Sequence, residues 1–163
     1  MGAAAGVIAV VTYGPGFASG CAEVLASVPE WFGRPASNAR YLADLARHRS
    51  WIAVAEGTLI GAITLTEPQP RSFEVHFLVV ARAWHGRGVG TELLRTAEGA
   101  AAMRAGRWLH VKTLGPSNPD ANYARTRRFY LKHGFAPLFE STTLWHARTP
   151  ALVLVKALAA AGN

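Results

Sequence analysis

Apolar residues follow two different spacings along the chain, and these spacings predict its elements. Short runs rich in branched and aromatic side chains, bounded by glycine, proline or polar residues, predict strands at residues 7–12, 51–55, 58–66, 73–80, 108–114, 135–145 and 152–157. Apolar and small side chains that recur every three to four residues predict helices at residues 17–28, 38–48, 89–104 and 123–132. The order β, α, α, β, β, β, α, β, α, β, β favours an α/β fold with a mixed sheet and helices on both faces.

Turn residues mark several boundaries between these elements. Glu56 and Gly57 predict a tight turn that joins two neighbouring strands into a hairpin. Pro68 and Pro70 are expected to end the second strand of that hairpin, because proline has no N–H for a sheet ladder. Gly134 is the expected C-terminal signal of the last helix.

Length and composition fit one globular domain over residues 1–163. The chain is 50% hydrophobic and 17% charged, which excludes the composition of a disordered protein. Its apolar stretches are shorter than the roughly 20 residues of a membrane-spanning helix. Residues 1–11 lack the basic start and the cleavage site of a secretory signal. We therefore expect no association with a membrane and a cytoplasmic location.

Charge and the reactive side chains narrow the classes of ligand. Seventeen Lys and Arg residues against ten Asp and Glu residues give a net charge of +7. Three explanations of this positive charge remain open: a nucleic-acid partner, a polyphosphate ligand, or simply an arginine-rich composition. Cys21 is the only cysteine and the histidines do not follow a metal-ligand spacing, so no metal site is expected.

A glycine-rich segment between the strand at 73–80 and the helix at 89–104 carries the clearest chemical signal. Gly86, Gly88 and Gly90 alternate with other residues, which allows a sharp turn that exposes backbone N–H groups at a helix N-terminus. Arg82 and Arg87 flank the turn and can add positive charge. The segment therefore predicts a phosphate-binding turn. It lacks the G-x-G-x-x-G spacing of dinucleotide-binding folds and the Gly-Lys-Ser/Thr of a Walker loop.

Two motifs together resemble the GNAT superfamily of acyl-CoA N-acyltransferases. His85, Gly88 and Gly90 are similar to the family's pyrophosphate motif Arg/Gln-x-x-Gly-x-Gly/Ala, with His85 in place of the usual Arg or Gln. Phe129 and Tyr130, followed by Gly134 and Phe135, resemble its Phe-Tyr-x-x-x-Gly-Phe element. The order of the expected elements is also the family's over nearly the whole chain.

The resemblance implies a GNAT-like fold with a mostly antiparallel central sheet, and an acetyl-CoA-dependent N-acetyltransferase. Such an enzyme moves an acetyl group to a primary amine of a small molecule or a peptide by direct transfer in a ternary complex, without a metal. A homodimer is compatible with it, whereas nucleic acid is not an expected partner. It also implies that CoA contacts the following residues: Leu78, Val80, Arg82, His85, Gly86, Arg87, Gly88, Val89, Gly90, Thr91 and Arg128. The alternative is a catalytically silent domain that binds CoA as a sensor.

Candidate catalytic residues follow from the same resemblance and from strand alternation. Glu74 and His76 lie on one face of the strand at 73–80, together with Leu78 and Val80, and either is a candidate base. Tyr130 matches the family's general acid, because a phenol is protonated at neutral pH and can donate to a departing thiolate.

Each of these side chains also has a simpler structural interpretation. Glu74 could be solvated, His76 could be a hydrogen-bonded strand residue, and Tyr130 could be a packed aromatic. Arg128 is a phosphate ligand or part of a solvated basic face. Trp31 and Phe32 either line the acceptor pocket, where an aromatic ring attracts an amine, or form a packing corner between two helices.

Overall fold

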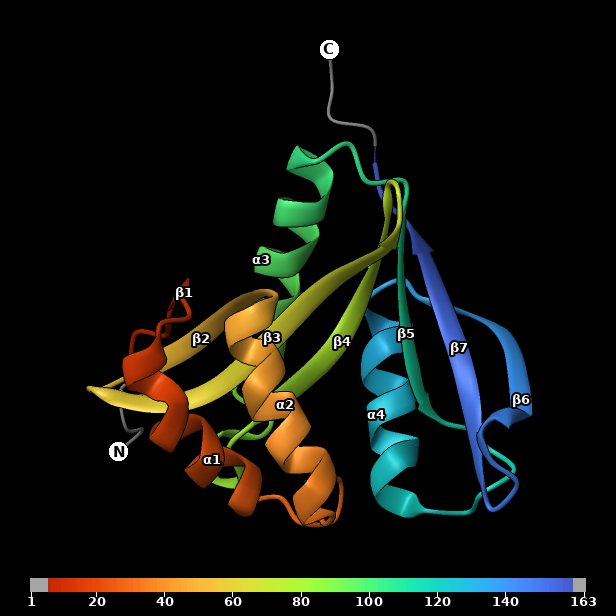
Figure 1. The fold of residues 1–163 in the computed structure, drawn as a ribbon, viewed down its shortest axis with the longest axis horizontal. Helices are drawn as coiled ribbons and strands as arrows, with labels where there is room; N and C mark the ends of the chain where they lie inside the picture. Colours follow the sequence, from red (N-terminus) through yellow and green to blue (C-terminus); the bar gives the residue numbers. More distant parts are fainter. Residues whose placement is uncertain (1–5, 160–163) are drawn as a thin grey trace. The chain divides into compact units, whose positions relative to one another are not determined.

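The computed structural model describes residues 6–159, which form two compact units. Unit 1 holds the chain up to Leu65 together with Phe77–Ala97, and unit 2 holds Thr66–His76 together with the chain from Glu98 onward. The strands pair in the order β1-β2-β3-β4-β5-β7-β6, and only β4 and β5 are parallel among the pairs whose direction is known (Figure 1). The predicted α/β class with a mostly antiparallel sheet is confirmed, while a single domain over residues 1–163 stays a prediction.

The helices and strands follow the predicted order. The strands are β1 Ala9–Thr12, β2 Arg49–Ala55, β3 Thr58–Gln69, β4 Ser72–Val80, β5 Trp108–Leu114, β6 Ala136–His146 and β7 Thr149–Ala157. The α-helices are α1 Ala18–Ala26, α2 Pro35–Arg47, α3 Val89–Met103 and α4 Ala121–Lys132. Two short 3₁₀ turns, η1 Pro15–Phe17 and η2 Arg82–Trp84, were not expected from the sequence.

Two proline-containing boundaries differ from the sequence prediction. Helix α2 begins at Pro35, three positions before the predicted start at residue 38, because a proline in the first helical turn lacks only an N–H that would have no intrahelical partner. Strand β3 continues through Pro68 to Gln69. Its pairing with β2 ends at Leu65, so Pro68 lies on a stretch with no β2 ladder to interrupt.

Unit 1 is built on two opposite faces of the strands β2 and β3. Ile52 pairs with Ala62 and both side chains belong to the core under α1 and α2, which includes Cys21 and Phe77. Burial raises the pKa of the Cys21 thiol to about 11, so the thiol stays protonated. The neighbouring residue Gly61 belongs to the other face, where α3 packs.

Gly61 allows α3 to approach the backbone of β3 closely. A Cβ at this position would lie 2.9 Å from the Val79 carbonyl oxygen, 3.0 Å from Leu93 Cδ1 and 3.2 Å from Val89 Cγ1. We expect Gly61→Ala to lower the free energy of unfolding by about 1–3 kcal/mol, since the backbone oxygen cannot move aside without disturbing the strand. Chemical denaturation measures this change.

A matched variant separates overpacking from the general effect of removing a glycine. Gly99 lies exposed in α3, and a Cβ there would meet nothing within 4 Å. Gly99→Ala should therefore stabilise the protein by about 0.5–1 kcal/mol, because alanine is the better helix former. An unchanged or increased stability of Gly61→Ala would contradict the close packing of α3 on β3.

Unit 2 is built from the first half of β4, from β5, β7 and β6, and from α4. Strand β5 pairs with β7 from Trp108↔Ala157 to Leu114↔Ala151. Helix α4 begins at the N-cap Asp120, whose carboxylate accepts hydrogen bonds from the N–H groups of Asn122 and Tyr123 at 2.8 and 3.1 Å. It ends at Lys132, and its predicted C-terminal signal Gly134 follows two positions later with a φ of 87°.

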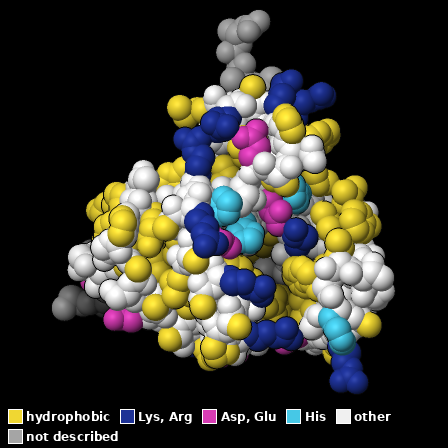
Figure 2. Space-filling model, viewed as in Figure 1, with side chains coloured by type: hydrophobic (Ala, Val, Ile, Leu, Met, Phe, Trp, Pro, Cys, Tyr) yellow, Lys and Arg dark blue, Asp and Glu magenta, His cyan; other side chains and the backbone are white. Residues whose placement is uncertain are grey.

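Basic side chains are spread over the surface. On the face drawn in Figure 2, Lys and Arg stand in separate groups among apolar and uncharged side chains. Several of them are ion-paired within their own unit, as in Arg95 with Glu92 at 2.8 Å and Lys156 with Glu98 at 2.7 Å. No helix within residues 6–159 is long and apolar enough to cross a membrane.

Candidate functional site

The glycine-rich turn in unit 1 joins η2 to the start of α3 and has the backbone geometry that the sequence predicts. Gly86 and Gly88 adopt φ values of 72° and 83°, a region that favours glycine. Both are exposed, and a Cβ at either would meet nothing within 4 Å. Val89 is buried under the turn and begins α3, with Gly90 and Thr91 in its first turn. The turn therefore presents open backbone at a helix N-terminus.

The N–H groups of this turn have a distinct hydrogen-bond pattern. Where α3 begins, Glu92 N–H donates to Gly88 O at 3.1 Å, so Gly88 O closes the first hydrogen-bonded turn of the helix. The first N–H groups of an α-helix have no intrahelical acceptor and carry the positive end of the helix dipole. This combination can bind an anionic group such as a phosphate.

Two of the predicted phosphate contacts, Arg82 and His85, have partners within unit 1 that hold the turn in place. The Arg82 guanidinium is ion-paired with Glu30, and its Nε donates to Ser27 O at 3.0 Å. His85 Nε2 lies 2.9 Å from Val80 O, and since a carbonyl can only accept, this nitrogen carries the proton and donates. The side chains of Arg82 and His85 thus connect the turn to the end of α1 and to β4.

The remaining predicted residues of unit 1 lie beside the turn or near its supports. Arg87 is exposed with its guanidinium 5.0 Å from the centroid of the Trp84 ring, a cation–π distance. Leu78 and Val80 are half-buried on β4, where they alternate with the buried residues Phe77 and Val79.

The predicted acceptor residues belong to an aromatic cluster. The ring of Trp31 meets His85 edge-on at 5.6 Å between centroids. Phe32 packs edge-on against Tyr41 at 5.7 Å and Phe77 at 5.6 Å. Trp31 and Phe32 are both half-buried. The structure thus brings the predicted acceptor segment, through Trp31, into contact with the predicted phosphate turn, through His85.

In unit 2, the candidate base Glu74 lies in a charged group on β4 and β5. Its strand pairs with β5 in parallel from Ser72↔Trp108 to Val75↔Val111, which places Glu74 opposite His110. One carboxylate oxygen of Glu74 lies 3.4 Å from His110 Nε2, and the other lies 3.0 Å from Lys112 Nζ. We call these three residues the charged triad. Its side chains are 10%, 21% and 35% exposed for Glu74, His110 and Lys112 in that order.

The ionisation of Glu74 is set by two opposing influences. Burial raises the pKa of its carboxyl, but hydrogen bonds and charges from His110 and Lys112 together outweigh burial and leave that pKa below its ordinary value. Glu74 is therefore a carboxylate at neutral pH with both oxygens engaged. The second candidate base, His76, lies half-buried on β4 just beyond the last residue pair with β5.

Tyr130 lies on α4 within a separate aromatic group of unit 2. Its ring meets Phe129 at 5.1 Å and Phe135 at 5.3 Å, both edge-on, and the residue is 4% exposed. Burial raises the pKa of the phenol, so the hydroxyl keeps its proton well above neutral pH. Among the described residues, this hydroxyl has no hydrogen-bond partner.

The other basic residues of α4 differ in what they contact. Arg127 donates to Leu114 O at 2.7 Å and so ties α4 to the end of β5. Arg128 is exposed, and the described part of the chain provides no partner for its guanidinium. Arg128 is thus available to an anion. No group of three or more His, Cys, Asp or Glu residues within 6–159 could hold a metal ion.

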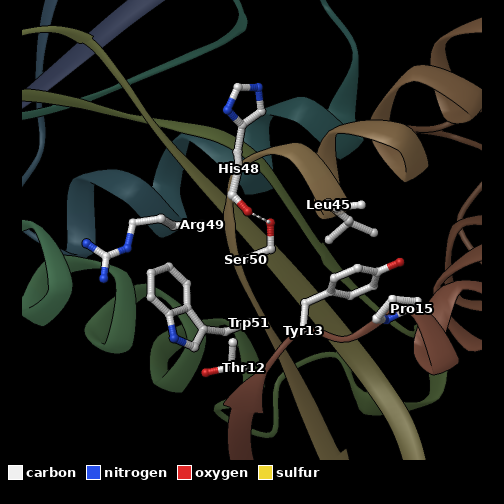
Figure 3. Close-up of a pocket in the computed structure, with 9 residues that line it drawn as sticks. Thr12, Tyr13, Pro15, Leu45, His48, Arg49, Ser50 and Trp51 are labelled. Carbon is white, nitrogen blue, oxygen red and sulfur yellow. Dashed lines mark hydrogen bonds between the residues drawn. The ribbon is translucent and has the colours of Figure 1, made fainter.

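A pocket elsewhere in unit 1 contains none of the predicted site residues. It has a volume of about 280 Å³ and lies between the end of β1, the end of α2 and the start of β2 (Figure 3). Tyr13, Arg49 and Trp51 line it, and at its back the Ser50 hydroxyl donates to His48 O at 3.3 Å. The glycine-rich turn and the charged triad are therefore independent of this pocket.

Sequence reasoning missed two features of these sites. Lys112 was not singled out, although it lies two positions after His110 and strand alternation places both on one face of β5. The contacts of Arg82 with Ser27 and Glu30 join residues more than 50 positions apart, and no local pattern in the sequence signals them.

A family model and several solved structures match this chain. The model of the acetyltransferase (GNAT) domain matches residues 46–137, a segment that runs from the end of α2 into β6 and includes both the glycine-rich turn and Tyr130. No curated protein sequence matches the chain significantly.

Three solved structures illustrate the shared fold. A protein of Desulfovibrio desulfuricans assigned to the GNAT acetyltransferase family has a TM-score of 0.82 at 19% identity, covering 94% of this chain and 100% of its own. The ribosomal-protein-S18-alanine N-acetyltransferase of Escherichia coli has a TM-score of 0.75 at 13% identity, and the match covers 96% of this chain and 97% of that protein. An aminoglycoside 6'-N-acetyltransferase in complex with coenzyme A has a TM-score of 0.75 at 18% identity, and the match covers 95% of this chain and 99% of that protein. These similarities extend over nearly the whole chain and show a common fold.

Proposed function

Because the chain belongs to the GNAT acetyltransferase family, we propose that it transfers an acetyl group from acetyl-CoA to a primary amine of a small molecule or a peptide. The transfer is direct, within a ternary complex of both substrates. The observation that carries this proposal is the glycine-rich turn, where Gly86 and Gly88 open the backbone at the N-terminus of α3.

The residues of the turn fit the pyrophosphate of CoA. Its backbone N–H groups lie at the positive end of a helix dipole, and no side chain covers Gly86 or Gly88. Arg87 is an exposed cation beside the turn, and the exposed Arg128 of unit 2 stays a proposed phosphate ligand on the strength of its sequence motif alone. Arg82 and His85 hold the turn in position, so we assign them a positioning role.

The remaining candidate residues are assigned the three roles that acyl transfer requires, which are an acid, a hydrogen-bond donor to the acetyl carbonyl and a base. Bound acetyl-CoA supplies the acetyl group as a thioester. Tyr130 is the proposed acid: its phenol is protonated and has a free hydroxyl to donate to the departing sulfur. Leu78 and Val80 are the proposed source of a backbone N–H for the acetyl carbonyl. The base is proposed to come from the polar residues of β4 or of the neighbouring strand β5. Glu74 and His76 on β4 are the candidates that the sequence predicts.

The acceptor amine is proposed to bind at Trp31 and Phe32. Aromatic faces attract ammonium groups, and this segment contacts the turn through the Trp31 and His85 rings. The relatives in the same fold act on an aminoglycoside in one case and on an alanine of a ribosomal protein in another. Both names describe transfer of an acetyl group to nitrogen, which supports an amine as the class of acceptor proposed for this chain.

Calorimetric titration of the purified protein with acetyl-CoA tests the proposal first, with ATP and NAD as controls. We expect acetyl-CoA to bind and the two controls to bind at least tenfold more weakly, because the turn lacks the spacing of their binding motifs. Thiol release in the presence of amines then distinguishes an enzyme from a silent sensor, which would bind without transfer. A folded protein that does not bind acetyl-CoA would refute the proposal.

A further inference from the structure

We propose that His110 is the base that removes a proton from the acceptor ammonium, and that Glu74 is a positioning residue that orients His110. This inference rests on the proposed function and assigns the base to a residue on β5. It starts from the charged triad, in which Glu74 lies opposite His110 in the strand register and contacts both His110 and Lys112.

Glu74 itself is poorly suited to accept the proton. Both of its oxygens are engaged, one with Lys112 Nζ at 3.0 Å and the other with His110 Nε2 at 3.4 Å. Its side chain is 10% exposed, against 21% for His110. Its pKa is lowered by these contacts despite burial, which makes it a weaker base than an ordinary carboxylate.

The same contact fixes the form of His110 that a base requires. A carboxylate can only accept a hydrogen bond, so the neutral imidazole places its proton on Nε2, toward Glu74. Nδ1 is then left with a free lone pair. Once Nδ1 takes a proton, the carboxylate stabilises the charged ring, and the ammonium of Lys112 keeps Glu74 ionised.

Titratable groups flank His110 on the strands of unit 2, among them His76, which lies two positions after Glu74 on the same face of β4. Glu74 faces His110 from β4 and Lys112 lies on the same strand as His110, whose partner on β7 is the uncharged Val155. The next residue of β7, Lys156, is paired with Glu98 at 2.7 Å. On α4, Arg127 donates to Leu114 O and the His133 ring bonds to Phe129 O, so each has a partner other than His110.

The protons balance across the reaction. The acceptor nitrogen begins as an ammonium with three protons and ends as an amide with one. The first proton moves to His110 Nδ1 and later to solvent, which frees the lone pair that forms the C–N bond. As the C–S bond breaks, the departing sulfur takes the proton of the Tyr130 hydroxyl, and the second proton lost from nitrogen passes through solvent to the tyrosinate and restores the phenol.

The test is the pH dependence of thiol release from acetyl-CoA, with an aminoglycoside, a polyamine and a peptide with a free N-terminal alanine as acceptors. For an accepted amine, we expect His110→Gln to lower kcat by about 10²- to 10⁴-fold with an unchanged KM for acetyl-CoA. In the His110→Gln variant, the ionisation that limits kcat/KM of the wild-type protein at low pH should disappear. Glu74→Gln should keep that ionisation and lower kcat less than His110→Gln does, because the base remains but loses the carboxylate that orients its ring.

His146→Gln is the matched control, since His146 is an exposed histidine of unit 2 at the end of β6. It should leave the pH profile unchanged. An ionisation that survives in His110→Gln, or a kcat within threefold of wild type, would overturn the inference while leaving the acetyltransferase intact. If the wild-type protein acetylates none of the amines, the proposed function fails instead.

A second measurement addresses the same inference without turnover. Nitrogen-15 NMR of the histidine rings reports which ring nitrogen carries the proton in the neutral form. We expect Nε2–H for His110 in the wild-type protein. A proton on Nδ1 would leave no lone pair on that nitrogen and would rule out its role as the base.

Discussion

Replacing Tyr130 with Phe is expected to lower the turnover of acetyl transfer by about 10²- to 10⁴-fold and to leave the affinity for acetyl-CoA within about threefold. Phenylalanine keeps the edge-on contacts with Phe129 and Phe135 but removes the hydroxyl that would protonate the departing thiolate. Steady-state kinetics and calorimetric titration of the same preparation measure the two effects separately.

The control for this substitution is Tyr13→Phe, which removes a phenolic hydroxyl at the pocket of Figure 3 in unit 1. It should leave turnover unchanged. Equal losses of turnover and affinity in Tyr130→Phe, or no loss of either, would remove Tyr130 from the acid role. Because burial raises the pKa of Tyr130, its ionisation should not limit activity below the ordinary tyrosine range near pH 10.

The substitution Gly88→Val is expected to weaken acetyl-CoA binding by about 10- to 100-fold. The loss corresponds to about one hydrogen bond to a charged group, since a side chain at this position would cover the N–H groups that the phosphates need. The strained backbone should also cost about 1–3 kcal/mol of stability. Calorimetry gives the affinity, and denaturation gives the stability.

Gly57→Val supplies the matched control for this prediction. Gly57 has a φ of 75° against 83° for Gly88, and a Cβ at either position meets nothing within 4 Å. Both variants therefore strain the backbone to a similar degree, but Gly57 lies in the turn between β2 and β3. If the two variants lost affinity equally, the effect would be general destabilisation and the phosphate-binding role of the turn would be refuted.

The order of the elements could be predicted from the sequence because each carries its own local pattern. The helix α3 shows apolar and small residues at helical spacing, and it begins at Val89 as expected. The end of α4 before Gly134 and the turn at Glu56 and Gly57 could also be predicted, since both glycines adopt a positive φ that glycine tolerates. The start of α2 could not be predicted in this way. Ser37 resembles an N-cap, but Pro35 already occupies the first turn of the helix.

The candidate site was predictable only where one segment contains it. The glycine-rich turn lies within ten residues, so its backbone geometry follows from its sequence. The charged triad depends on which residue of β5 lies opposite Glu74, and a sequence does not give the register of two strands separated by a helix. For the same reason, the contacts of Glu74 with His110 and Lys112 could not be predicted, and its role as a base stays a prediction.

The contacts of Arg82 bear on any attempt to change the acceptor by exchanging the segment between α1 and α2. Arg82 N–H donates to the Ser27 hydroxyl at 3.2 Å, and its guanidinium is held by Ser27 O and by Glu30, which directly precedes Trp31. A transplanted segment that lacks Ser27 or Glu30 would release the turn beside η2 along with the old acceptor residues. Acceptor choice and cofactor affinity would then change together, so a graft that alters one alone has to begin after Glu30.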